Sequence, residues 1–133
     1  MSILDGLADT PALSHAVFLG DFAVEEARVV AQVPLDASAG ATARSMSLVL
    51  TTDIPASTSD YWVCQVGMFL TGSFRTLVEF SLGAGIKKNT LRRMSFQKSL
   101  SLRPGDVLGI TMTPRGQPSP LVGVSVVVDW GSK

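Results

Sequence analysis

The sequence predicts an all-β protein, a two-sheet antiparallel sandwich of about eight strands. Three observations lead to this prediction. Apolar and polar residues alternate with a period of two in one segment after another, as in strands with one face on a core. The intervening segments are rich in glycine, proline, serine and aspartate, which favour turns. No segment shows the 3.6-residue apolar period of a helix, apart from residues 2–8, which are interrupted by Gly6.

The eight expected strands are, in chain order, 15–20, 26–33, 44–51, 61–71, 74–82, 91–102, 107–113 and 121–130. The alternation also predicts which side chains face the core. These are Val29, Ala31 and Val33 in the second strand, Met46, Leu48 and Leu50 in the third, Trp62, Cys64, Val66, Met68 and Leu70 in the fourth, Phe74, Val78, Phe80 and Leu82 in the fifth, Met94, Phe96, Leu100 and Leu102 in the sixth, and Val122, Val124, Val126, Val128 and Trp130 in the last.

The connections favour particular sandwich topologies. In the segment 103–106, Pro104 presets φ and Gly105 can supply a positive φ, which predicts a type II turn between two antiparallel strands. Several other connections run to seven or more residues and suit crossovers between sheets. A jelly-roll or Greek-key sandwich is therefore favoured over a closed ligand-binding barrel, whose strands would be joined by short hairpins.

At 133 residues the chain has the length of one domain. We expect an N-terminal arm over residues 1–13 and a single β-sandwich domain over residues 14–133. The arm lacks the basic start and long apolar run of a signal peptide, and no window is long and apolar enough for a membrane helix. Two uses of the arm stay open: it folds back over its own sandwich, or it docks on a neighbouring subunit.

Charge is sparse, at 17% of residues, and apolar residues make up 46%. Such a composition suggests surface hidden against partners. Residues 1–66 hold eight acidic and two basic side chains, a net charge of −6, and residues 67–133 hold nine basic and three acidic, a net charge of +6. This asymmetry could drive association of identical subunits, or the two charges could simply mix across one sandwich.

Catalytic chemistry is poorly represented, so we expect no enzyme, no cofactor and no metal site. His15 is the only histidine and Cys64 the only cysteine, and Cys64 lies in the apolar phase of its strand, which favours an inert buried thiol. Glu25 and Glu26 are adjacent, so in a strand they would point to opposite faces and could not flank one glycosidic bond. Phosphate-loop and nucleophile-elbow motifs are absent from the sequence.

Three groups of residues are candidates for an interface. The arm has exposed aliphatic side chains, the fourth strand is apolar in its outward phase too, and the segment 87–98 is basic with no acid. The basic segment could face an anionic partner, or it could only solvate a loop and guard a strand. The candidates are Ile3, Leu4, Leu7, Tyr61, Val63, Phe69, Lys87, Lys88, Arg92 and Arg93.

With its strand pattern, the Pro104-Gly105-Asp106 turn and the strand Val122–Trp130, the chain resembles the small jelly-roll cement or decoration proteins of tailed-bacteriophage virions. The resemblance implies a non-catalytic protein made in the host cytoplasm and located in the virion. Its partners would be itself, as a dimer or trimer, and a major capsid protein lattice, with no membrane and with nucleic acid disfavoured.

The alternative is a carbohydrate- or receptor-binding β-sandwich module, for instance of a phage tail. Trp62, Trp130 and Tyr61 could form a sugar-stacking platform, although the phase of both tryptophans favours the core.

Overall fold

The computed structural model describes residues 12–35 and 40–131, and these residues contain eight strands and no helix. The strands are β1 (Ala12–Phe22), β2 (Glu26–Gln32), β3 (Ala41–Val49), β4 (Tyr61–Leu70), β5 (Ser73–Ser81), β6 (Arg92–Leu102), β7 (Val107–Arg115) and β8 (Leu121–Gly131). β1 begins at Ala12, two residues before the expected end of the arm; the rest of the arm lies outside the described residues.

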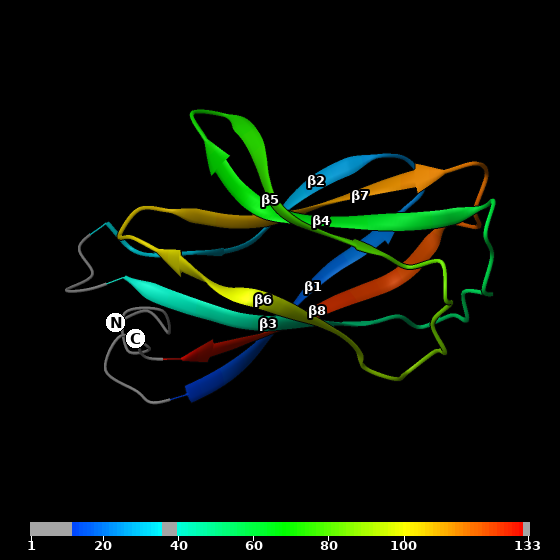
Figure 1. Cartoon of the computed structure of the whole chain (residues 1–133), viewed down its shortest axis with the longest axis horizontal. Coiled ribbons are helices and arrows are strands. Elements are labelled where there is room, and N and C mark those ends of the chain that lie inside the picture. Colours follow the sequence, from blue (N-terminus) through cyan, green and yellow to red (C-terminus); the bar gives the residue numbers. More distant parts are fainter. Residues whose placement is uncertain (1–11, 36–39, 132–133) are drawn as a thin grey trace.

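The strands form two antiparallel four-stranded sheets, which we call sheet A (order β1-β8-β3-β6) and sheet B (order β2-β7-β4-β5). Figure 1 shows the sheets as two stacked layers. β1 pairs with β8, β2 with β7, β3 with β6 and β4 with β5. The chain is thus a long two-stranded ribbon rolled over itself, which is jelly-roll topology. The predicted fold class is confirmed.

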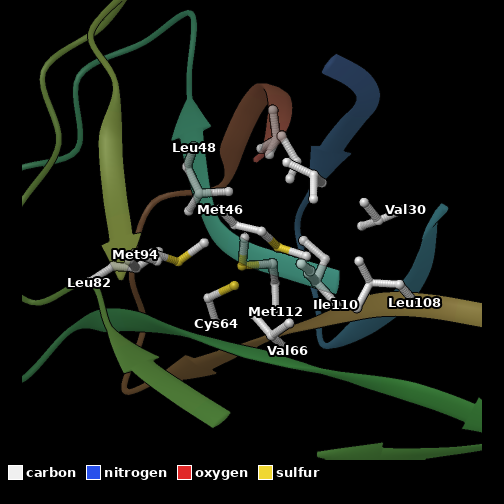
Figure 2. Close-up of a cluster of buried hydrophobic side chains, with 14 of the residues drawn as sticks. Val30, Met46, Leu48, Cys64, Val66, Leu82, Met94, Leu108, Ile110 and Met112 are labelled. Atoms are coloured by element: carbon white, nitrogen blue, oxygen red, sulfur yellow. The ribbon is translucent and has the colours of Figure 1, made fainter. Parts of the chain in front are cut away.

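The core between the sheets is rich in sulfur. Met46 and Met94 of sheet A meet Cys64 and Met112 of sheet B at its centre, and all four side chains are buried (Figure 2). Unbranched methionine side chains can fill the irregular space between two twisted sheets. Trp62 and Trp130 are the largest fully buried side chains, so both tryptophans serve core packing.

The predicted phase is wrong where a strand carries a bulge. Val29 was expected in the core but is 53% exposed, while Val30 is buried. In the pairing of β2 with β7, Val29 faces Gly109 and Ala31 faces Leu108, so Val30 is an extra residue. A bulge of one residue reverses the phase of the strand on its two sides.

A second bulge shifts the start of β8. Phe22 pairs with Leu121 and Gly20 with Val124, so β8 has one more residue than β1 between these pairs. Gly123 adopts φ +62°, a left-handed conformation that glycine tolerates without strain. As a result Leu121 is fully buried in the position expected for Val122, which is only half-buried.

Leu70 is also wrongly predicted to be buried, because it lies at the end of β4, where the β4–β5 hairpin bends away from the body of the sandwich (Figure 1). The turn at 103–106 is as expected. The amide of Asp106 donates to the carbonyl of Arg103 over 3.0 Å, Gly105 has φ +91°, and the Asp106 carboxylate accepts the amide of Arg103 over 2.7 Å. These features define a type II turn.

The buried sulfur core predicts an unreactive thiol. Burial raises the pKa of Cys64 to about 12, so almost none of it is thiolate at neutral pH. In the native protein a thiol reagent should modify Cys64 only slowly, whereas a thiol introduced by Ser99→Cys, at an exposed site, should react at once. Modification of Cys64 within seconds would contradict this packing.

Cys64→Ser should destabilise the fold by about 1–3 kcal/mol, because it leaves a hydroxyl in an apolar core. Chemical denaturation of the wild-type and variant chains measures this difference.

Candidate functional site

His15 is occupied by a structural contact. It lies on β1 opposite Val128, and its Nδ1 accepts a hydrogen bond of 2.7 Å from Nε1 of the buried Trp130. The two rings lie in nearly parallel planes, 7° apart. Burial lowers the pKa of His15. The neutral imidazole therefore orients Trp130, and its Nδ1 lone pair is not available to act as a base.

Cys64 belongs to β4 of sheet B, whereas His15 belongs to β1 of sheet A. The thiol is completely buried and protonated, and the imidazole is bound to Trp130. Nothing in this arrangement activates the thiol as a nucleophile.

Most of the acidic side chains for which a contact is described are used to hold the fold. The carboxylates of Asp21, Asp53, Asp60 and Asp106 accept backbone amide hydrogens in loops and turns. Within the described ranges no three His, Cys, Asp or Glu side chains gather closely enough to hold a metal ion. The same ranges contain no helix that could span a membrane.

Asp129 lies on the outer face of sheet A, between two serines in register with it on the neighbouring strands. Its carboxylate accepts hydrogen bonds from Oγ of Ser14 (2.5 Å) and Oγ of Ser45 (2.7 Å). These two bonds hold the pKa of Asp129 below its ordinary value, against the opposing effect of burial, and the charge of Arg93 adds to the lowering. The row fixes β1, β8 and β3 laterally.

The outward phase of β4 lies on the outer face of sheet B, as the sequence indicates. Tyr61 and Phe69 are half-buried there, and Val63 is only 4% exposed because neighbouring side chains already cover most of it. The Phe69 ring lies over Gly109, where an added Cβ would come within 2.3 Å of it, and it packs edge-on against Phe74 with 5.3 Å between centroids.

The register shows that this outer face is almost free of charge. Its described members across the four strands include Glu79 as an acid and Arg115 as a base. The uncharged members are Ala27 and Val29 of β2, Tyr61, Val63, Gln65, Gly67 and Phe69 of β4, Phe74, Thr76 and Ser81 of β5, and Val107, Gly109, Thr111 and Thr113 of β7. A sheet face in contact with water usually carries more charged side chains.

The predicted basic segment is not brought together on one surface. Lys87 and Lys88 lie exposed in the loop before β6, where the amide of Lys88 donates to Asp53. Arg92 and Arg93 are consecutive in β6, so their side chains leave opposite faces of the strand. Ile3, Leu4 and Leu7 lie outside the described residues.

The largest concavity is a groove on the open side of the sandwich, between the edge strands β5 and β6. Its volume is about 600 Å³. The half-buried side chains of Val78, Phe80, Phe96 and Leu100 form an apolar floor that continues the core, and the rings of Phe80 and Phe96 lie 6.0 Å apart. We call this feature the β5–β6 groove. Its remaining lining residues are Leu77, Glu79, Ser95, Gln97, Lys98 and Ser99.

Both walls of the groove are strands that have a neighbour on one side only, within the described residues. β6 also departs from β3 beside the groove: Ser95 pairs with Ser45 and Leu100 with Ala43, so residues 96–99 form a wide bulge. The backbone along this bulge is therefore free of strand pairing. An extended peptide could bind such a site through main-chain hydrogen bonds as well as apolar contacts.

Comparison of the chain with models of protein families and with curated proteins finds no match. The functional interpretation therefore depends on the fold and its surfaces.

The β5–β6 groove was not predicted from the sequence. The alternation correctly placed Phe80 and Phe96 on the inward phase, but strand order decides whether an inward side chain lies at the centre or at an open side. The only local signal is the Phe96–Leu100 spacing, in which the apolar period of two is interrupted by Gln97, Lys98 and Ser99.

The contact between His15 and Trp130 predicts a pH dependence of stability. Because burial lowers the pKa of His15 in the folded state, the unfolded chain binds a proton at higher pH than the folded chain does. Stability should be full above the model value of 6.5 and should fall as the pH drops below it.

Melting temperatures measured between about pH 7.5 and about pH 5.5 test this expectation, with a loss of about 1 kcal/mol if the bond to Trp130 breaks. His15→Asn is the matched control, since its amide oxygen can accept the Trp130 hydrogen but does not titrate. A wild-type chain whose melting temperature is flat over this range, or falls as steeply in the variant, would contradict the assignment.

Proposed function

We propose that this chain is a non-catalytic structural protein that acts as a multimer, of the kind that decorates and stabilises a virus shell. The observation that carries the proposal is the nearly uncharged outer face of sheet B. A sheet whose two faces both lack charge needs cover on both sides, and the core covers only one of them.

The energetics favour a partner on this face. Val29 is 53% exposed beside the half-buried ring of Phe69, and both would lose water contact against a second surface. Burial of apolar area contributes roughly 25 cal/mol per Å², from which the cost of ordering two molecules must be subtracted. An interface of ordinary size therefore needs several such side chains together, as this face provides.

The state of the reactive groups supports a non-catalytic role. The Cys64 thiol is buried and protonated, His15 is bound to Trp130, and Asp129 is bound to two serines. Each of these groups is used to hold strands together. Jelly-roll domains also occur in lectins, but both tryptophans are buried here and offer a sugar no exposed stacking surface.

The choice of a virion as the location rests on the resemblance to decoration proteins. In this proposal the chain associates with itself as a dimer or trimer and binds a repeating lattice of a major capsid protein. Low overall charge suits such a role, since it leaves surface that neighbouring subunits can cover.

Self-association through sheet B can be tested by light scattering of the purified protein. We expect a dimer or trimer at micromolar concentration, and we expect Val29→Lys to shift it to monomer without lowering the melting temperature, because this side chain is exposed. Val24→Lys is the matched control, since Val24 is 64% exposed but lies in the β1–β2 turn, off the sheet face. A wild-type monomer would contradict self-association.

The particle itself can be sought by sedimentation from lysates of infected host cells. The native protein should sediment with virus particles and be released, as an intact folded protein, only when the particles are disrupted. Val29→Lys should sediment less than Val24→Lys. Recovery of the native protein solely in the soluble fraction, away from any particle, would exclude the virion role.

A further inference from the structure

We propose that the β5–β6 groove binds residues 1–11 of a second copy of this chain as an extended strand. This inference rests on the self-association proposed above and names a segment and a site for it. Four properties of the groove and of the segment support it: shape, reach, side-chain pattern and charge.

The shape of the groove suits an extended peptide. Its β6 wall consists of six consecutive residues, Ser95 to Leu100, which is a length of about 20 Å for extended chain. The floor is apolar, and both walls are edge strands within the described part of the chain. A compact ligand would use the floor alone, whereas a peptide strand also satisfies the unpaired backbone groups of the bulge at residues 96–99.

The segment leaves the sandwich at the right level. Ala12 is in register with Gly131, Thr42 and Ser101 across sheet A, so the arm departs at the end of the sheet where the groove also ends. β1 and β6 are three strand spacings apart, about 14 Å. Eleven extended residues reach about 36 Å, enough to bridge to a neighbour.

Within its own chain the segment would have to turn back across an end that loops already cover. There the amide of Val33 donates to the carbonyl of Asp106 over 2.9 Å, and the amide of Gly105 donates to the carbonyl of Val33 over 2.8 Å. The arm of a second copy avoids this detour, which favours exchange between subunits.

The side-chain pattern of the segment also fits. In an extended strand, Asp5 and Asp9 share one face, and the opposite face carries Leu4, Gly6 and Ala8. The uncharged face can lie on the apolar floor of the groove, while the two carboxylates point outward to the rim, where Lys98 is exposed.

The charges are complementary. Together β5 and β6 carry four basic residues, Arg75, Arg92, Arg93 and Lys98, and one acidic residue, Glu79. Gln65 already donates a hydrogen bond of 3.0 Å to the Glu79 carboxylate. An acidic strand therefore approaches basic walls, which favours this segment and its orientation.

The experiment is disulfide trapping between two full-length variants, one carrying Leu4→Cys and the other Leu77→Cys. Leu77 lines the groove and is 40% exposed, so its replacement should not disturb folding. Native Cys64 gives no background, because it is buried and protonated. Mild oxidation of the mixture should produce a heterodimer linked through positions 4 and 77.

The control mixture pairs Leu4→Cys with Leu35→Cys, an 83% exposed leucine in the β2–β3 connection, and should give no heterodimer above the level of random collision. A double variant Leu4→Cys/Leu77→Cys separates the two possible routes. Should the arm occupy the groove of its own chain, the double variant would form an internal disulfide while the mixture formed no heterodimer, and exchange between subunits would be overturned.

Trapping in neither sample would overturn the groove assignment altogether, and light scattering of the untreated wild type then shows whether self-association survives by another surface. As a second measurement, Lys98→Glu and Leu77→Glu should each reduce the fraction of multimer with an unchanged melting temperature, and Leu35→Glu should not. Equal effects of all three variants would refute binding at the groove.

Discussion

The structure depends on one constraint: two sheets share a single core, and each strand of the rolled ribbon contributes one face to it. Pairs that lie far apart in the chain, such as β1 with β8, must form before that core closes. The contact between Trp130 and His15 and the row of Ser14, Asp129 and Ser45 both join β8 to its neighbours. Polar side chains are thus spent on holding strands in register, and no reactive group remains free of such a role among those described.

The same constraint explains what local sequence could predict. Alternation with a period of two is set by the backbone itself, so the eight strands and most buried positions followed from the residues alone. Bulges escaped because an extra residue such as Val30, or the pair before Val124, has meaning only relative to the partner strand. Gly123 in β8 was a signal in this case, since glycine within a strand often marks a bulge.

Strand order was equally hidden. The sequence placed Phe80 and Phe96 on inward phases, and both do face inward, yet they line an opening because β5 and β6 are edge strands. Edge strands invite uncontrolled pairing, and this chain limits it with the bulge at residues 96–99 and with Lys98. The bulge that protects the edge also widens the space between the sheets. The groove is therefore a consequence of edge protection.

Two kinds of contact between copies follow from these surfaces, and they differ in symmetry. Packing of one sheet B face on another is self-complementary and closes as a pair, whereas an arm bound in the groove of the next copy is directional and closes only as a ring or continues as a chain. A protein that has both can link closed units into a larger array. Such an array suits the covering of a repeating surface better than it suits a soluble binding module, which needs only one site.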